Sequence, residues 1–260
     1  MPNAHFQFKQ FTIHQDRCAM KVGTDGVLLG AWSSLSKKAE TDESKILDIG
    51  AGTGLISLML AQRYPMAQIT AVEIDNNAAA QCAENFAASP WTSRLSIVPL
   101  SLHDAEPALT THILPYDPMS RLGGFDMIVS NPPFYNATLK PNDEGRAVAR
   151  HKDSLPIDEI AAFAQRWLAP DGTLWLIYPT DYDDEVTTAC IIHGLKPAVI
   201  CDVLTKVGKP CKRRMAAFSR QGSEAWNMPL LRQQLAIRNE DGEYSEEYRH
   251  LVESYYLWLH

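Results

Sequence analysis

Four consecutive residues, Asn131, Pro132, Pro133 and Phe134, could hold a flat amine for catalysis. They follow an apolar run, residues 125–129, that predicts a buried strand. An amine on an aromatic ring or an acyl group is a poor nucleophile, because its lone pair is delocalised. The Asn131 side-chain oxygen and the Pro132 carbonyl can accept hydrogen bonds from its two N–H groups, the prolines stiffen the loop, and Phe134 offers a stacking face. Taken in isolation, these residues are better explained as a turn that closes the strand. Together with the cofactor-binding residues described next, they predict a catalytic site that holds a planar amine for methyl transfer.

Three glycines in one short turn, Gly50, Gly52 and Gly54, follow a predicted strand at residues 45–49 and open a predicted helix. Glycine lets a ligand approach the backbone, and the N-terminus of the helix then points at that ligand. The Gly-x-Gly-x-Gly spacing differs from the Gly-x-Gly-x-x-Gly register of dinucleotide-binding enzymes, which disfavours a nicotinamide dehydrogenase. We predict that these glycines, with Asp48 at the end of the strand, bind a cofactor.

Glu73 lies near the end of a second predicted strand, residues 69–74, about twenty residues after the glycine turn. A carboxylate in that place can accept hydrogen bonds from both hydroxyls of a ribose, so the cofactor is predicted to contain adenosine. After the third predicted strand, residues 95–99, Ser101 and Asp104 are predicted to lie near the adenine ring, with Asp104 accepting from its exocyclic amine. His103 is a further candidate for the adenine ring, with a surface histidine as the alternative. No metal is expected, because no His, Asp or Glu recurs at metal-ligand spacing.

Strands and helices alternate along most of the chain. Seven strands are predicted at residues 45–49, 69–74, 95–99, 125–129, 173–178, 198–204 and 215–218, and helices after the glycine turn and at residues 76–88, 156–168, 181–193 and 245–259. This order indicates an α/β fold with a mostly parallel sheet covered on both faces and with ligands at the carboxyl ends of the strands. The last two strands are joined by a basic loop rather than a helix, which predicts an antiparallel hairpin at the sheet edge.

The composition is typical of one globular domain. With 260 residues and 45% hydrophobic content the chain can bury a sizeable core, and we expect a single domain, residues 45–260, preceded by an N-terminal segment, residues 1–44. No long apolar run or signal-peptide pattern is present, which predicts a cytoplasmic protein. Five scattered cysteines without a Cys-x-x-Cys pair predict reduced thiols rather than disulfides or zinc.

The formal net charge of -7 means that a nucleic acid partner must be held by a local basic patch. Such a patch is predicted around the loop of the last hairpin, where phosphate contacts are the natural use of clustered cations. A solvated turn is the alternative. The cluster consists of Lys206, Lys209, Lys212, Arg213, Arg214 and Arg220.

The glycine turn, Glu73 and the Asn-Pro-Pro-Phe sequence, in this order, resemble the class I S-adenosylmethionine-dependent amino-methyltransferases over residues 45–178. Three further stretches are similar to the bacterial tRNA adenine-N6 methyltransferases within that class. They are residues 8–11 with residues 16–32 (DRCAMKVGTDGVLLGAW), Ser89-Pro90-Trp91, and the tyrosine-rich C-terminal segment. The resemblance therefore covers nearly the whole chain.

This resemblance implies a Rossmann-like class I methyltransferase fold with a seven-stranded sheet, S-adenosyl-L-methionine as the cofactor and adenine 37 of a valine tRNA as the substrate. It implies that residues 21–28 fold over the cofactor, so that the N-terminal segment caps its site, with Gly23, Thr24 and Asp25 near the methionine portion. Asn131 would contact the cofactor as well as the amine. Arg150, beside His151, would contact the RNA, with a solvated charged loop as the alternative.

Two departures from the family pattern keep other substrates open. Ser101 stands where an acidic residue is expected, and Phe134 stands where adenine-modifying members often carry Tyr and guanine-modifying members often carry Phe. The Asn-Pro-Pro-aromatic sequence is shared by enzymes that act on adenine N6, guanine N2 and glutamine amides. Guanine-N2 methylation of ribosomal RNA and glutamine-N5 methylation of a protein are therefore alternatives, and a cofactor-binding RNA chaperone without catalysis is a third.

Overall fold

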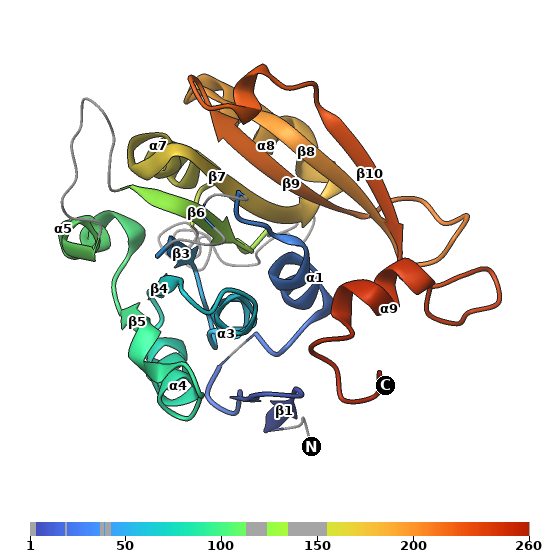
Figure 1. Ribbon diagram of the computed structural model, residues 1–260, viewed down its shortest axis with the longest axis horizontal. Helices are drawn as coiled ribbons and strands as arrows, with labels where there is room; N and C mark the ends of the chain where they lie inside the picture. The colour runs from blue at the N-terminus through green and yellow to red at the C-terminus, as the bar shows by residue number, and fades with distance from the viewer. Residues whose placement is uncertain are drawn as a thin grey trace, which may run out of the picture.

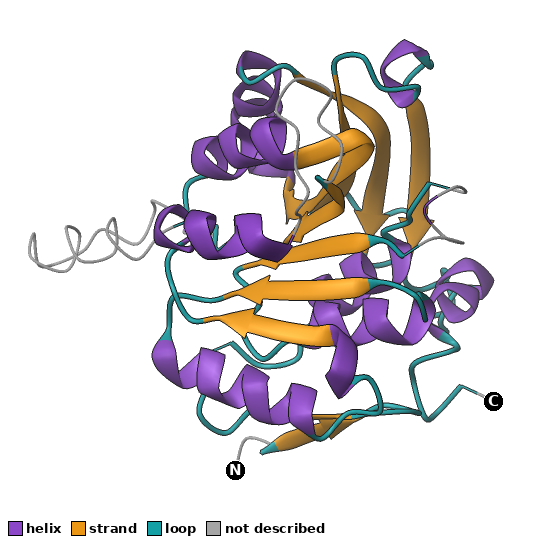
Figure 2. Cartoon of the chain, turned by 60° about the vertical axis from the view of Figure 1, so that its left-hand side comes forward, coloured by secondary structure: helices purple, strands orange, loops and turns teal. Residues whose placement is uncertain are grey.

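The computed structural model describes residues 4–18, 20–36, 39, 43–112, 124–134 and 155–259. Arg150, a predicted RNA contact, lies outside the described residues. Within them the chain forms one large sheet with helices on both faces and a separate N-terminal hairpin (Figures 1 and 2). The α/β prediction is confirmed.

The large sheet has eight strands in the described residues, in the order β10-β8-β9-β7-β6-β3-β4-β5. Strands β3 to β7 are mutually parallel along their shared edges, β9 is antiparallel to both β7 and β8, and β10 runs parallel to β8. The strands are β3 (Lys45–Ile49), β4 (Gln68–Val72), β5 (Leu95–Val98), β6 (Phe125–Ser130), β7 (Leu168–Pro179), β8 (Leu195–Leu204), β9 (Arg213–Arg220) and β10 (Leu231–Ala236). All seven predicted strands are present.

The predicted antiparallel hairpin, β8 with β9, is confirmed, but its place at the sheet edge is wrong. β10 covers the outer side of β8, in register from Leu231 opposite Val199 to Ala236 opposite Leu204. The sequence of β10 is Leu-Arg-Gln-Gln-Leu-Ala, and its first four residues are exposed. It lacks the alternation of apolar and polar residues from which a strand can be predicted. Pairing with β8, rather than burial of its side chains, makes this segment a strand.

Seven helices cover the sheet in the described residues and divide between its two faces (Figure 2). One core contains side chains of α1, α3, α4 and α9 with those of the N-terminal hairpin, and a second core contains those of α5, α7 and α8. The helices are α1 (Thr24–Trp32), α3 (Leu55–Arg63), α4 (Asn76–Ala87), α5 (Leu102–His112), α7 (Ile157–Trp167), α8 (Asp183–Ile192) and α9 (Glu246–Val252). Short 3-10 turns η1 (Thr92–Arg94), η2 (Thr180–Tyr182) and η3 (Ala225–Asn227) join some of them.

The N- and C-terminal segments pack together. Strands β1 (His5–Gln7) and β2 (Thr12–His14) form a hairpin, and the Asn85 side chain of α4 bonds both the amide and the carbonyl of His14. The predicted helix at residues 245–259 is too long, because α9 ends at Val252. Beyond it, the Tyr255 carbonyl accepts a hydrogen bond from the Lys9 amide, and Tyr256 stacks on Phe8. These contacts replace the continued helix.

Both the backbone conformation and the close packing at Gly54 exclude residues with a side chain. Its φ of 82° lies in the left-handed region, and a Cβ atom there would come within 2.6 Å of the Phe86 ring and 2.8 Å of the Cys82 sulfur, both on α4. The start of α3 therefore packs directly on α4. This contact fixes how closely the glycine turn lies to the end of β4.

We expect Gly54→Ala to lower the free energy of unfolding by more than about 2 kcal/mol, because it adds a clash to the cost of about 1–2 kcal/mol for a left-handed L-residue. Urea denaturation monitored by circular dichroism measures this. Gly194→Ala is the matched control, since Gly194 has a φ of 74° with nothing within 4 Å of the added atom. Equal losses in the two variants would show that the packing on α4 contributes nothing.

Candidate active site

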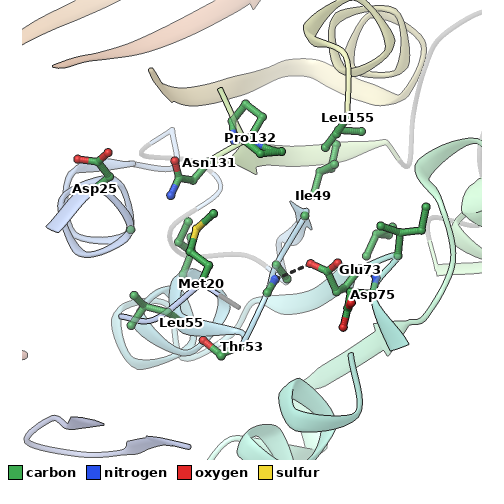
Figure 3. A pocket seen from close by; sticks show the side chains of 18 of the residues that line it. Met20, Asp25, Ile49, Thr53, Leu55, Glu73, Asp75, Asn131, Pro132 and Leu155 are labelled. Atoms are coloured by element: carbon green, nitrogen blue, oxygen red, sulfur yellow. Dashed lines mark hydrogen bonds between the residues drawn. The ribbon is translucent and has the colours of Figure 1, made fainter. Parts of the chain in front are cut away.

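A cavity of about 1130 Å³ opens at the carboxyl ends of β3, β4, β6 and β7 (Figure 3). It brings together most of the residues that the sequence indicated. Its lining includes Gly23, Thr24, Asp25, Gly50, Gly52, Glu73, Ser101, Asn131, Pro132, Pro133, Phe134 and Arg213. Residues from the N-terminal segment, from the ends of four parallel strands and from the last hairpin thus meet in one place.

Glu73 ties the end of β4 to the glycine turn. One carboxylate oxygen accepts a hydrogen bond from the Gly52 amide at 2.8 Å, drawn as the dashed line in Figure 3, and the other accepts from the Asp75 amide at 2.9 Å. The residue is only 9% exposed, so its orientation is fixed. Each oxygen keeps a lone pair for a further donor. The arrangement suits a carboxylate that receives two ribose hydroxyls.

The glycine turn presents backbone to the cavity. The amides of Gly50 and Ala51 donate to the Val72 carbonyl at the end of β4, which holds the turn against the neighbouring strand. A Cβ atom on Gly52 would meet nothing within 4 Å, so a ligand can come close to this residue. On the far side of the turn, α4 begins with Asp75 as its N-cap, whose carboxylate accepts a hydrogen bond from the Ala78 amide at 2.8 Å.

Asp48 lies behind the glycine turn and does not line the cavity. It is fully buried, and its Oδ2 atom accepts hydrogen bonds from the amide and the hydroxyl of Ser57 in α3. No described residue bonds its Oδ1 atom. Burial, with a smaller contribution from the charge of Glu73, raises the pKa of Asp48 to about 7. Its position makes it a support of the turn, not the direct cofactor contact that the sequence suggested.

Ser101 and Asp104 were both predicted to lie near adenine, but only Ser101 lines the cavity. The Ser101 hydroxyl donates to the Asp104 carboxylate at 2.7 Å and accepts from the Asp104 amide at 3.1 Å. Asp104 is thereby turned back onto the start of α5. It fixes the Ser101 side chain instead of facing the cavity itself.

The Asn-Pro-Pro-Phe residues follow β6 directly and face the cavity from the side opposite Glu73. The Ser130 hydroxyl donates to the Ile49 carbonyl at 2.8 Å, which holds the end of β6 against the end of β3. In Figure 3 the Asn131 side chain extends toward Asp25 and Met20. No described residue forms a hydrogen bond with its amide group, so that group is available to a substrate. Phe134 is half-buried, with its ring centroid 4.9 Å from that of Tyr182.

The N-terminal segment is bound across the cavity by an ion pair. The Arg213 guanidinium, at the first residue of β9, donates to the Asp25 carboxylate in the first turn of α1 at 2.8 Å. Upstream, the Gln15 side chain accepts from the Val22 amide at 2.7 Å, and the Lys21 ammonium bonds the Gln15 carbonyl. These contacts place residues 21–25 on the cavity wall, where Gly23 precedes α1 as its N-cap.

The structure separates the predicted basic cluster into parts with different surroundings. Lys209 and Lys212 are exposed and Lys206 is half-buried. All three lie in the loop after β8, at the same end of the strands as the cavity. Arg214 is engaged elsewhere, because its guanidinium pairs with Asp183 and Asp202. Arg220 lies at the opposite end of β9 and donates to the Leu168 carbonyl, so its grouping with this patch is wrong.

Several lining residues carry no chemical signature in the sequence. Ile74 and Leu100 line the cavity and stay 50% and 41% exposed, and Leu155, Ile177 and Tyr178 line it from other elements. Ile74 directly follows Glu73, which is the one local signal that could have indicated it. An apolar side chain left open beside a carboxylate suits the flat face of a base.

In the described part of the chain, no three His, Cys, Asp or Glu side chains are grouped so as to hold a metal ion. Among its helices, none combines the length and the apolar character needed to cross a bilayer.

A mostly parallel sheet of this order, with a glycine turn, a ribose-type carboxylate and Asn-Pro-Pro-Phe at its carboxyl edge, defines a class I methyltransferase. Residues 32–188 match the family described as "Methyltransferase small domain". The chain is 42% identical over 260 residues to a tRNA1(Val) (adenine(37)-N6)-methyltransferase of Bacteroides thetaiotaomicron, covering 100% of both chains. It is 40% identical over 256 residues to the protein of that name from Aeromonas hydrophila, covering 98% of each. The chain belongs to the tRNA1(Val) (adenine(37)-N6)-methyltransferase family.

Solved structures share the fold. A crystal structure described as a predicted O-methyltransferase from Agrobacterium tumefaciens superposes with a TM-score of 0.62 at 16% identity and covers 89% of this chain and 96% of its own. M. jannaschii TYW2 in complex with AdoMet superposes with a TM-score of 0.51 at 11% identity, with 85% and 88% covered. The class I fold predicted from the sequence is confirmed.

The surroundings of Asp48 predict a pH-dependent stability. Burial raises the pKa of Asp48 to about 7 in the folded chain, whereas its ordinary value, 3.8, applies to the unfolded chain. As the pH rises, the unfolded chain therefore loses the Asp48 proton at a lower pH than the folded chain does. Stability is therefore lost between about pH 4 and pH 7, by an amount on the order of 4 kcal/mol. We expect the stability of Asp48→Asn relative to the wild type to rise over this interval in urea titrations.

Glu240→Gln, which neutralises an exposed carboxylate, is the control and should leave the pH profile unchanged. Parallel profiles for the wild type and Asp48→Asn would show that Asp48 titrates normally.

Proposed function

We propose that this protein transfers a methyl group from S-adenosyl-L-methionine to N6 of adenine 37 in tRNA1(Val). The observation that carries this proposal is the Asn131 amide, which bonds none of the described residues, beside the Pro132 carbonyl on the cavity wall opposite Glu73. The names of the relatives supply the acceptor base and the tRNA. With tRNA as its substrate, the protein would act in the cytoplasm.

The cavity residues fit S-adenosyl-L-methionine. Glu73 would accept the ribose hydroxyls, since both of its oxygens keep a free lone pair beside the open backbone of Gly52. Ser101 would face the adenine edge and Ile74 its flat side, while Gly23 and Thr24 would lie near the methionine portion. When bound, this cofactor supplies a methyl group activated by a positively charged sulfur.

The catalytic role of Asn131 follows from the electronics of the acceptor. Its side-chain oxygen and the Pro132 carbonyl would accept hydrogen bonds from the two N–H groups of the adenine amine. These bonds favour the geometry in which the nitrogen lone pair leaves the ring plane. They also strengthen as positive charge develops on nitrogen, so they stabilise the transition state more than the ground state. A strong general base is unnecessary, because the methylated nitrogen is acidic enough to lose its proton afterwards.

Phe134 would stack on the base once it has left the RNA strand. The ring is supported from behind by Tyr182 and by Tyr178, whose centroid lies 6.3 Å away. Stacking on Phe134 requires only a flat face, which adenine and guanine share. Discrimination between the two bases would therefore rest on the hydrogen bonds to the amine rather than on stacking.

The RNA would lie over the loop between β8 and β9. Arg213 begins β9, two strands away from the end of β6, and neighbouring strands lie about 4.8 Å apart, so this loop starts roughly 10 Å from Asn131. Lys206, Lys209 and Lys212 would then contact phosphates next to the flipped nucleotide. A local patch of this kind compensates for the acidic character of the whole chain.

Asn131→Ala should lower kcat at least about 100-fold, because it removes one preorganised acceptor, while cofactor affinity stays within about twofold. Labelled methyl transfer to a tRNA1(Val) transcript measures the first, and calorimetry with cofactor measures the second. A transcript with guanine at position 37 is the substrate control. Label in N2-methylguanine or in protein, with none in N6-methyladenine, would contradict the proposed substrate.

Changing Lys206, Lys209 and Lys212 together to Gln should reduce the slope of log K against log salt for tRNA binding by about 2, at roughly 0.7 for each phosphate contact. Lys209→Gln alone should reduce this slope by about a third of the reduction in the triple variant. Arg232→Gln, on the exposed amino-terminal part of β10, is the matched control. An unchanged slope in the triple variant would place the RNA elsewhere.

A further inference from the structure

Arg214 occupies the centre of a polar network beneath the acceptor side of the cavity. Its Nε atom donates to Asp202 at 2.7 Å, and its Nη1 atom pairs with Asp183 at 2.5 Å. The other oxygen of Asp183 accepts from the Tyr178 hydroxyl at 3.0 Å. The Arg214 side chain is 16% exposed, so the network is largely shielded from solvent.

The sheet itself brings these residues into one row. Tyr178 on β7, Arg214 on β9 and Asp202 on β8 are directly opposite each other in register, and the three strands are adjacent (Figure 1). Asp183 begins α8, immediately after the turn that contains Tyr182. The network therefore joins three strands to the turn that follows β7.

This turn carries the aromatic support of the acceptor site. Tyr178 is 1% exposed, and its ring centroid lies 6.3 Å from that of Phe134, while Tyr182 lies at 4.9 Å. Burial and the neighbouring Asp183 raise the pKa of Tyr178, so its hydroxyl stays protonated and keeps donating to Asp183. The orientation of Tyr178 thus depends on Asp183, and that of Asp183 depends on Arg214, while Tyr182 directly precedes Asp183 in the chain.

We propose that Arg214 is a positioning residue for the methyl acceptor, which through Asp183 holds Tyr178 and the turn that ends in Tyr182, and thereby fixes the ring of Phe134 against the flipped base. This inference rests on the proposed acceptor site. It assigns Arg214 a role different from the phosphate contact that its place in a basic stretch suggests. A guanidinium is suited to this role because its planar fork binds two carboxylates at once, which an ammonium group cannot do in the same geometry.

Two variants test the role without removing a ring. Arg214→Lys keeps the charge and loses the fork, and Asp183→Asn keeps the shape and loses the carboxylate. We expect each to lower kcat about 10–100-fold, with cofactor affinity, tRNA affinity and the salt slope of tRNA binding within about twofold of the wild type. The double variant should be no worse than the more affected single one, because both act through one network. Arg232→Met is the control for lost charge and should retain wild-type kcat.

A spectroscopic measurement reports the ring directly. The protein contains eight phenylalanines, so protein labelled with 4-fluorophenylalanine gives several fluorine signals. The signal that is lost in the Phe134→Leu variant is assigned to Phe134. We expect a single narrow fluorine resonance in the wild type that broadens or splits in Arg214→Lys and in Asp183→Asn. Tyr178→Phe, which removes only a hydroxyl, provides a milder variant if either of these fails to fold.

The outcomes are distinguishable. A wild-type protein that methylates no RNA would refute the proposed function, and the fluorine spectra would still decide whether Arg214 fixes Phe134. Wild-type kcat and an unchanged Phe134 resonance in Arg214→Lys would overturn the positioning role. A reduced salt slope in Arg214→Met, with Asp183→Asn behaving as the wild type, would also overturn it and would make Arg214 a phosphate contact.

Discussion

The hydrogen bonds of the Glu73 carboxylate are the constraint on which the arrangement of this site depends. They hold the amide of Gly52 to the end of β4, while Gly50 and Ala51 bond the same strand through Val72. The turn can reach that position because Gly54 adopts a left-handed conformation directly against α4. With the ends of β3 and β4 joined, and β6 joined to β3 through Ser130, the two halves of the cavity face each other at a fixed separation.

Ion pairing decides what each cation on β9 can do. Arg213, Arg214 and Arg220 lie on one strand and carry the same charge, yet their partners differ. Arg213 pairs with a carboxylate on the cavity wall, Arg214 with one carboxylate on β8 and one at the start of α8, and Arg220 with a backbone carbonyl at the far end. Arg214, whose side chain is 16% exposed, is costly to redirect toward a phosphate, because its two carboxylate partners would be left unpaired. Among the described residues, no acidic side chain forms an ion pair with Lys206, Lys209 or Lys212 of the adjoining loop. Functional assignment therefore follows the partners of a residue, not its place in a basic stretch.

Much of the fold could be predicted because its local patterns are strong. The apolar runs that became β3, β4 and β6 end in residues that punctuate the chain, and the alternation with helices predicts a parallel sheet. The predictions failed where tertiary contacts override local pattern. β10 is a strand because β8 offers an unpaired edge, although its own residues are mostly polar and exposed. The helix ending at Val252 stops early because the backbone and rings beyond it pack on the N-terminal hairpin.

The sequence by itself determined the reaction type, because the glycine turn, Glu73 and Asn131 are local signatures whose chemistry depends on residue type and on order along the chain. It also determined the family, through similarity over the whole chain. Only the tertiary structure decided which polar residues face the cavity. Asp48 and Asp104 are acidic residues beside the right strands, but one is buried under α3 and the other is turned onto α5. The direction of a side chain depends on partners that are distant in sequence, such as Asp25 for Arg213 and Asp183 for Arg214, and no local pattern records those partners.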